Sequence, residues 1–245
     1  MKNKIILITG GTGSLGKALI KRLKKNNKII VYSRDEGKQA LEFGHDPSII
    51  RVIGDIRDFD KLNITLQRHK VDYIIHTAAL KRIDDMEFYP DECVKTNING
   101  SENVARAALE NKVKKCILVS TDKACQPVNV YGSSKFIAER IFTNYDYHSS
   151  KTIFTSIRYG NVIAFVNIRS AMNLENAHGG EVFVPQINSY TLPTCIKVLE
   201  QITNKKAITT VTGLRPGEKL HEDMLAETEL PFTYQVPNIN LLQIR

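Results

Sequence analysis

A glycine-rich turn near the N-terminus restricts the folds that this 245-residue chain can adopt. Gly10, Gly13 and Gly16 follow a β-branched apolar stretch at residues 4–9 and open an amphipathic stretch at residues 15–25. Small residues at this spacing let the backbone turn tightly and approach a pyrophosphate, which the free amides of a helix N-terminus stabilise. A position between a strand and a helix favours a dinucleotide site over a simple loop. We therefore predict cofactor contacts from Gly10, Thr12, Gly13, Ser14, Leu15 and Gly16.

The first two-thirds of the chain alternates strand-like and helix-like stretches, the pattern of parallel strands joined by crossover helices. The predicted strands are residues 4–9, 29–32, 49–53, 73–76, 115–119 and 153–157, and the predicted helices are residues 15–25, 58–69, 90–111 and 134–144. The last third is irregular, with a strand-like stretch at 182–185 and a helical one at 192–201. We predict an α/β fold: a doubly wound parallel sheet of the Rossmann type over residues 1–163, interleaved with a smaller substrate-binding portion over residues 164–245.

Composition narrows the class of protein. The net charge of +8 could suit nucleic acid, but the Lys and Arg residues are scattered, so solvated helix faces explain them better and we expect no nucleic-acid partner. The four cysteines lie far apart without a C-x-x-C pair, which indicates reduced thiols and no metal site. Apolar runs are too short to cross a bilayer and the N-terminus leads directly into a strand, so we expect a cytoplasmic protein without a membrane partner.

The end of the second predicted strand indicates which dinucleotide is bound. Sites that prefer NAD commonly place a carboxylate there against the ribose 2′-hydroxyl, whereas this chain has Ser33 and Arg34. A guanidinium attracts a 2′-phosphate, so Arg34, together with Lys38, favours NADP. The alternative is an exposed surface arginine, and the neighbouring Asp35 leaves NAD open.

Further cofactor contacts are expected after the third and fourth predicted strands. Asp55, with Ile56, lies where an acceptor can meet the adenine amino group. Thr77, Ala78 and Ala79 are small enough to let the backbone lie against the cofactor, and Lys81 follows them, facing cofactor or substrate.

Tyr131 and Lys135 form a candidate catalytic pair. They are four residues apart at the start of a predicted helix, so their side chains share one face. We expect the ammonium to lower the pKa of the phenol, so that Tyr131 takes a hydroxyl proton while hydride leaves the same carbon. The spacing also occurs by chance on many helices, but this pair follows the fifth strand by a single loop, which favours catalysis.

These features together resemble the extended short-chain dehydrogenase/reductase superfamily, and more narrowly its inverting UDP-N-acetylglucosamine 4,6-dehydratases. The resemblance spans nearly the whole chain. Its most discriminating part is Asp122-Lys123 upstream of Tyr131, since reductases and 4-epimerases of the superfamily usually lack this acid-amine pair. Taken without the resemblance, Asp122-Lys123 could equally be a solvated turn pair. The similar segments are STDKA (120–124), YSRDE (32–36), GDIRD (54–58), AALK (78–81), EFYP (87–90), KTN (95–97), RYGN (158–161), GGEVFVP (179–185) and RPGEKLHE (215–222).

The resemblance implies a chemistry for each residue. Tyr131, helped by Lys135, deprotonates the sugar 4-hydroxyl as NADP⁺ takes the C4 hydride; Lys123 then removes the C5 proton and Asp122 protonates the departing 6-hydroxyl. Lys123 can act as a base only when neutral, and Asp122 as an acid only when protonated. The implied product is an inverted UDP-4-keto-6-deoxy-L-hexose derivative for surface glycan biosynthesis. The implied substrate contacts are Lys81, Thr121, Asn161, Arg215 and Glu218, with Lys219 as a further phosphate partner. The resemblance also implies a homo-oligomer, formed through the helices near 90–111 and 134–144.

The chain departs from these relatives between segments 159–162 and 178–181. Relatives carry a few dozen further residues there, which enclose the sugar, whereas Phe165 runs directly into Val166. Either the lid is short or a mobile lid is missing between these two residues. We favour the second, because a deletion would expose a reactive keto intermediate to water. This interpretation predicts a separation between the Phe165 carbonyl carbon and the Val166 nitrogen much longer than a peptide bond.

Two other functions stay open. A UDP-sugar 4-epimerase or reductase of the same superfamily needs Tyr131 and Lys135 but not Asp122 or Lys123. A non-catalytic NADP-binding scaffold needs none of the four.

Overall fold

A computed structural model describes residues 2–44, 46–160, 177–211, 213–215, 217–237 and 241–244. Within these residues one sheet has the strand order β3-β2-β1-β4-β5-β6-β7-β9-β8. All neighbours from β3 to β7 pair in parallel, whereas β9 is antiparallel to both β7 and β8. The strands are β1 (Ile5–Thr9), β2 (Lys28–Ser33), β3 (Ile49–Ile53), β4 (Tyr73–His76), β5 (Lys115–Val119), β6 (Ile153–Ile157), β7 (Val182–Pro185), β8 (Thr233–Gln235) and β9 (Leu241–Ile244).

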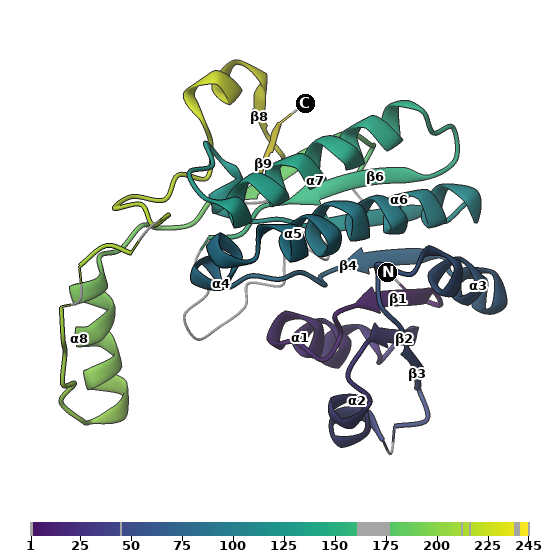
Figure 1. Ribbon diagram of the computed structural model, residues 1–245, viewed down its shortest axis with the longest axis horizontal. Helices are drawn as coiled ribbons and strands as arrows, with labels where there is room; N and C mark the ends of the chain where they lie inside the picture. The colour runs from purple at the N-terminus through teal and green to yellow at the C-terminus, as the bar shows by residue number, and fades with distance from the viewer. Residues whose placement is uncertain are drawn as a thin grey trace.

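Helices cover both faces of the sheet (Figure 1). Alternate residues of β1 point to opposite faces: Ile6 and Ile8 pack in the cluster that includes α1, and Leu7 packs in the cluster that includes α3, α6 and α7. This is the doubly wound architecture predicted from the sequence. The helical segments are α1 (Ser14–Leu23), α2 (Glu36–Phe43), α3 (Phe59–His69), α4 (Ile83–Phe88), α5 (Pro90–Cys93), the π-helical η1 (Val94–Asn99), α6 (Gly100–Glu110), the 3-10 turn η2 (Asp122–Ala124), α7 (Val130–Tyr147), α8 (Leu192–Thr203) and the 3-10 turn η4 (Glu227–Phe232).

Capping explains where α7 begins. The sequence predicts a helix from residue 134, but α7 starts at Val130 because the Asn129 side chain accepts a hydrogen bond from the Gly132 amide at 2.6 Å. Tyr131 therefore lies in the first turn of α7 and Lys135 in the second. The predicted helix at 90–111 is also interrupted, since η1 inserts a π-helical stretch between α5 and α6.

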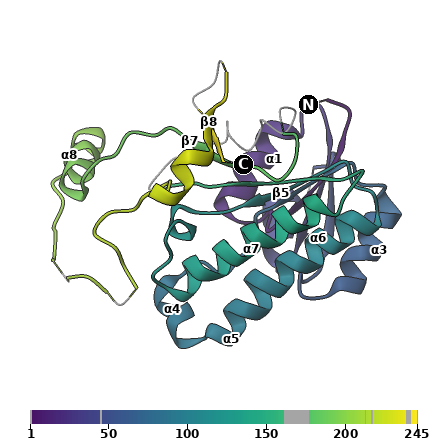
Figure 2. The same cartoon turned by 90° about the horizontal axis from the view of Figure 1, so that it is seen from above.

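The C-terminal portion completes the sheet and also extends away from it. β7 lies beside β6, and β9 and β8 continue the sheet beyond it. Figures 1 and 2 both show α8 standing apart from the sheet on long connections. None of the residues of α8 is buried. The predicted boundary at 163/164 and the Phe165–Val166 separation both lie outside the described residues.

Across the described residues, no helix is both long and apolar enough to span a membrane.

Candidate functional site

A cavity of about 630 Å³ lies at the carboxyl ends of the parallel strands. Its walls come from the glycine turn after β1, the ends of β2 to β6, the turn η2 and the start of α7. α/β folds bind ligands at this edge of the sheet. Every cofactor contact predicted from the sequence lines this cavity, namely Gly10, Thr12, Gly13, Ser14, Leu15, Gly16, Ser33, Arg34, Lys38, Asp55, Ile56, Ala78, Ala79, Lys81, Tyr131 and Lys135.

The glycine turn has room for a ligand only at Gly13. Gly10 has φ of +66°, and a Cβ there would lie 2.8 Å from the Ala78 backbone. A Cβ on Gly16 would lie 2.7 Å from the Gly10 carbonyl oxygen. A Cβ on Gly13 would meet only that same oxygen, at 3.3 Å, so the remaining space beside it belongs to the cavity. Two glycines thus close the turn, and the third leaves the start of α1 open to a pyrophosphate.

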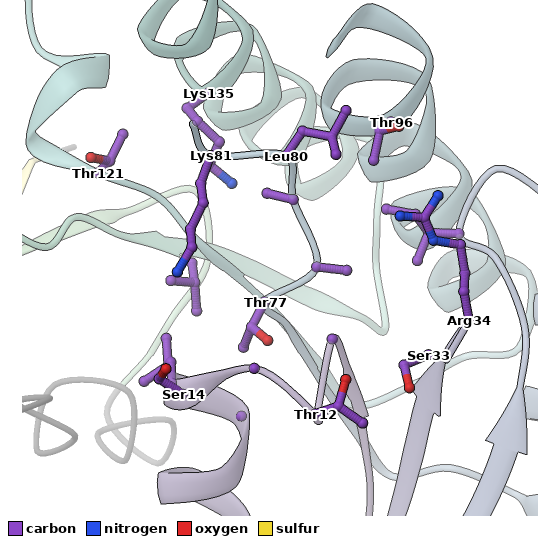
Figure 3. Close-up of a pocket in the computed structure, with 18 of the residues that line it drawn as sticks. Thr12, Ser14, Ser33, Arg34, Thr77, Leu80, Lys81, Thr96, Thr121 and Lys135 are labelled. Atoms are coloured by element: carbon purple, nitrogen blue, oxygen red, sulfur yellow. The ribbon is translucent and has the colours of Figure 1, made fainter. Parts of the chain in front are cut away.

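Asp55, at the far end of the cavity, contacts two guanidinium groups, of which Arg34 lines the cavity and Arg57 does not. Figure 3 shows Arg34 at the end of β2, across the cavity from Thr121 and Lys135. Arg34 Nη1 lies 3.6 Å from Asp55 Oδ2, and Arg57 Nε donates to the same oxygen at 3.1 Å. Partial burial opposes ionisation of Asp55, but hydrogen bonds from Arg57 outweigh it and hold the pKa of Asp55 below its usual value. Asp55 therefore meets a ligand as an anion that is already paired.

The carboxylate of Asp35 is already bound to groups of the helix that it precedes. Its side chain accepts a hydrogen bond from the Lys38 amide at 2.8 Å, which caps α2, and lies 3.0 Å from the Lys38 ammonium. Arg34 remains 57% exposed at the side chain and faces the cavity. The cation at the end of β2 is therefore more accessible to a ligand than the neighbouring carboxylate.

Tyr131 and Lys135 lie on the cavity wall with their charged forms disfavoured by burial. Burial lowers the pKa of Lys135 to about 8, although Glu139 opposes this shift. Burial also raises the pKa of Tyr131 to about 12; a hydrogen bond with Thr121 lowers it, and the Asp122 charge adds to the rise. The prediction that the phenol has a lowered pKa is thus wrong for the protein alone, because desolvation exceeds any stabilisation of the phenolate.

Asp122 and Lys123 form an ion pair beside this wall, on η2. Lys123 Nζ lies 3.2 Å from Asp122 Oδ1. The Lys123 side chain is 12% exposed and the Asp122 side chain is 3% exposed. The Thr121 hydroxyl donates to the same carboxylate oxygen at 2.7 Å. The alternative of a solvated turn pair is therefore wrong. Thr121, Lys123 and Tyr131 all line the cavity, while Asp122 lies buried behind them.

α7 approaches η2 so closely that only glycine fits between them. A Cβ on Gly132 would lie 2.3 Å from the Lys123 carbonyl oxygen. Gly132 lies between Tyr131 and Lys135 in the sequence. Its contact with the Lys123 backbone therefore sets the distance between the pair on α7 and the Asp122–Lys123 pair on η2.

The predicted substrate contacts are only partly brought together. Lys81 and Thr121 line the cavity, and Figure 3 shows Lys81 reaching into it. Arg215 lies outside the residues that line the cavity and pairs with Asp84 at 2.6 Å and with Glu218. Lys219, expected at a phosphate, donates to the Cys125 carbonyl oxygen at 2.9 Å. Asn161 lies outside the described residues, and the roles of Arg215 and Glu218 stay predictions.

A family described as polysaccharide biosynthesis protein matches residues 6–167 and 168–243 of this sequence. The chain belongs to this family. The inverting UDP-N-acetylglucosamine 4,6-dehydratase of Campylobacter jejuni subsp. jejuni serotype O:23/36 (strain 81-176) is 38% identical, over 96% of this chain and 81% of that protein. The UDP-glucose 4-epimerase of Rickettsia bellii (strain OSU 85-389) is 36% identical, over 93% of this chain and 79% of that protein. The sequence-based resemblance is therefore confirmed, while the two identities are too similar to separate two reactions.

A solved relative has the same fold along the chain. The X-ray structure of Pen from Bacillus thuringiensis matches with a TM-score of 0.89 and 32% identity, covering 99% of this chain and 89% of that one. The alignment with the Campylobacter relative runs over 277 positions, more than the 245 residues of this chain, so that family member carries residues without a counterpart here.

Sequence reasoning missed several residues of the cavity. Most lie at or just after the carboxyl ends of strands, so strand position alone could have indicated them. Thr96 comes from η1 and had no such signal. The additional lining residues are Tyr32, Gly54, Leu80, Thr96, Val119, Ser120, Tyr159 and Gly160.

Proposed function

We propose that this family member catalyses the NADP-dependent 4,6-dehydration of UDP-N-acetylglucosamine with inversion at C5. The observation that carries the proposal is the buried Asp122–Lys123 ion pair next to Tyr131, with Lys123 on the cavity wall and Asp122 directly behind it. A 4-epimerase moves a hydride at C4 alone and needs no second acid and base. A dehydratase must also remove a proton from C5 and protonate the leaving 6-hydroxyl.

The cavity supports NADP as the cofactor. The glycine turn can hold a pyrophosphate, and Arg34, with Lys38 beside it, offers positive charge where a 2′-phosphate would lie. A carboxylate suited to the 2′-hydroxyl of NAD is present as Asp35, but it caps α2 and pairs with Lys38. When bound, the nicotinamide would accept the C4 hydride and supply it again at C6.

Tyr131 and Lys135 serve the C4 position. The Tyr131 oxygen takes the proton of the 4-hydroxyl as a phenolate, so the phenol must first lose its own proton to solvent, which is unfavourable while its pKa is about 12. Lys135, with a pKa of about 8, is largely protonated at neutral pH and supplies a cation to the phenolate that forms. Ionisation of Tyr131 is favoured when further positive charge lies beside it, as an oxidised nicotinamide ring would supply, which couples this step to an occupied cofactor site.

Asp122 and Lys123 serve C5 and C6. As an ion pair they are an ammonium and a carboxylate, which is the wrong protonation state for a base and an acid. One proton moving from Lys123 Nζ to Asp122 Oδ1, atoms 3.2 Å apart, gives a neutral amine and a protonated carboxyl together. The amine can then take the C5 proton, and the carboxyl can protonate the leaving 6-hydroxyl.

Product analysis tests the proposal. Wild-type protein with UDP-N-acetylglucosamine and NADP⁺ is expected to give a product lighter by one water, seen by mass spectrometry, with inverted C5 by NMR. NAD⁺ in place of NADP⁺ is expected to support less turnover. Lys123→Ala is expected to lower formation of that product at least about a hundredfold, since it removes the C5 base.

The 4-epimerases among the relatives define the competing result. A product of unchanged mass with inverted C4, formed equally well by Lys123→Ala, would replace dehydration with epimerisation. Circular dichroism of the variant guards against loss of fold as the cause of inactivity.

A further inference from the structure

A second carboxylate, from a distant segment of the chain, contacts the candidate base. Glu222 Oε1 lies 3.1 Å from Lys123 Nζ, so this ammonium sits between Glu222 and Asp122. The Glu222 side chain is 18% exposed, and its second oxygen, Oε2, is buried with no hydrogen-bond partner among the described residues. A buried carboxylate with one unpaired oxygen destabilises the fold unless its charge is compensated by a nearby cation. Nothing in the local sequence around Lys123 predicts this contact.

Three further contacts fix the segment that carries Glu222 over η2. Asn129 Nδ2, on the residue that caps α7, donates to the Gly217 carbonyl oxygen at 2.6 Å. Lys219 Nζ donates to the Cys125 carbonyl oxygen at 2.9 Å, and the buried Arg158 donates to the Met224 carbonyl oxygen at 3.2 Å. Glu222 is therefore held in place from both sides, against the turn that carries Asp122 and Lys123.

We propose that Glu222 is a positioning residue for Lys123, which holds the amine toward C5 and stabilises the ammonium formed when Lys123 takes the C5 proton. The inference rests on the proposed dehydration. In that step the C5–H bond breaks, its electron pair moves into the C4 ketone to give an enolate, and the proton bonds to Lys123 Nζ. The new positive charge then lies between Glu222 and Asp122. Asp122 gives its own proton to the 6-hydroxyl, the C6–O bond breaks, water leaves, and the electron pair of the enolate forms the C5–C6 double bond. Glu222 thus supports the base much as the carboxylate of a serine-protease triad orients and stabilises its histidine.

The substitution Glu222→Gln tests this role, because it keeps the shape of the side chain and removes its charge. We expect kcat for dehydration to fall about tenfold to hundredfold, the effect typical of groups that orient a reactive group, while KM changes less than about threefold. We also expect C4 oxidation to persist, seen as absorbance of reduced nicotinamide after substrate addition. Exchange of the C5 proton with deuterium from the solvent, followed by NMR, is expected to slow by the same factor as kcat. Glu222→Asp, which restores the charge, is expected to recover part of the exchange.

The neighbouring carboxylate supplies the matched control. Asp223 is exposed, and Asp223→Asn removes one charge from the same segment; wild-type rates are expected for it. Equal loss of C4 oxidation and C5 exchange in Glu222→Gln, or no loss of either, overturns the inference. Absence of C5 exchange in the wild-type protein overturns the proposed dehydration, and the inference with it. Wild-type exchange that Glu222→Gln leaves intact removes the inference alone.

Discussion

Lys135 is a cation held where water cannot solvate it. The side chain is 3% exposed, and burial lowers the pKa of Lys135 from 10.5 to about 8. The spacing of four residues places Lys135 and Tyr131 on the same face of α7. How strongly each group is desolvated depends instead on the packing of β5, η2 and α7 against one another. The pairing could therefore be predicted from spacing, whereas the direction of the Tyr131 shift could not.

The lowered pKa of Lys135 predicts a pH dependence of stability. Between pH 8 and 10.5 the unfolded chain keeps the proton on this lysine while the folded protein loses it, so the unfolded state binds more protons. The free energy of unfolding therefore rises with pH between 8 and 10.5. This gain is present in full above pH 10.5 and is lost as the pH falls toward and through 8, where the buried lysine is protonated in the folded protein as well. Lys135→Met lacks this contribution. We expect urea unfolding to show that the free energy of unfolding of the wild type, relative to that of Lys135→Met, increases by about 2 kcal/mol from pH 8 to pH 10. A constant difference would contradict the assignment of the buried ammonium.

At the scale of the elements, the contact between α7 and η2 leaves no room for a side chain at Gly132. Gly132→Ala puts a methyl group where the Lys123 carbonyl oxygen now lies, 2.3 Å from the ideal Cβ position, so η2 must shift. We expect a loss of about 1–3 kcal/mol of stability and a fall in kcat of at least about tenfold, because Lys123 moves with η2. Chemical denaturation and steady-state kinetics measure the two effects.

Gly37→Ala is the control for helical glycine. A Cβ at Gly37 of α2 would meet only Asp35 Oδ1, at 3.5 Å, which is ordinary contact. Less freedom in the unfolded chain then makes the variant as stable as the wild type or slightly more so, with unchanged kcat. If Gly132→Ala behaved like Gly37→Ala, the close approach of α7 to η2 would not matter for catalysis.

The elements that the sequence predicts well are those with a pattern of their own. β5 and β6 are apolar runs with clear ends, and the residues predicted for them are those observed. α2, with eight residues including a glycine, has a weaker pattern and is not predicted. β8 and β9 have no signal because they form by pairing with each other and with β7. The contact between Glu222 and Lys123 is missed for the same physical reason: it depends on tertiary contacts between distant segments.

At the scale of the whole molecule, two exposed apolar surfaces compete as sites of self-association. One lies on η1 and α7, where a groove of about 370 Å³ is lined in part by Val94, Ile98 and Ile137. The other is α8, on which Leu192 and Ile202 are 71% and 73% exposed. Exposed apolar surface of this kind is typical of protein interfaces. The groove belongs to the helices through which the sequence resemblance implies a homo-oligomer, so we predict that the groove is the primary interface.

A charge placed on each surface separates them. Ile137, 41% exposed on α7, lies at the edge of the groove, and Ile137→Glu would bury an unpaired carboxylate if two copies meet there. Light scattering coupled to size exclusion is expected to give a smaller species for Ile137→Glu than for the wild type. Ile202→Glu, the matched change on α8, is expected to leave the size unchanged, since α8 lies away from α7, which lines the groove (Figure 1). The reverse outcome, with Ile202→Glu alone reducing the size, would assign the interface to α8. Its exposed apolar side chains would then be buried by a second copy rather than by the protein's own sheet.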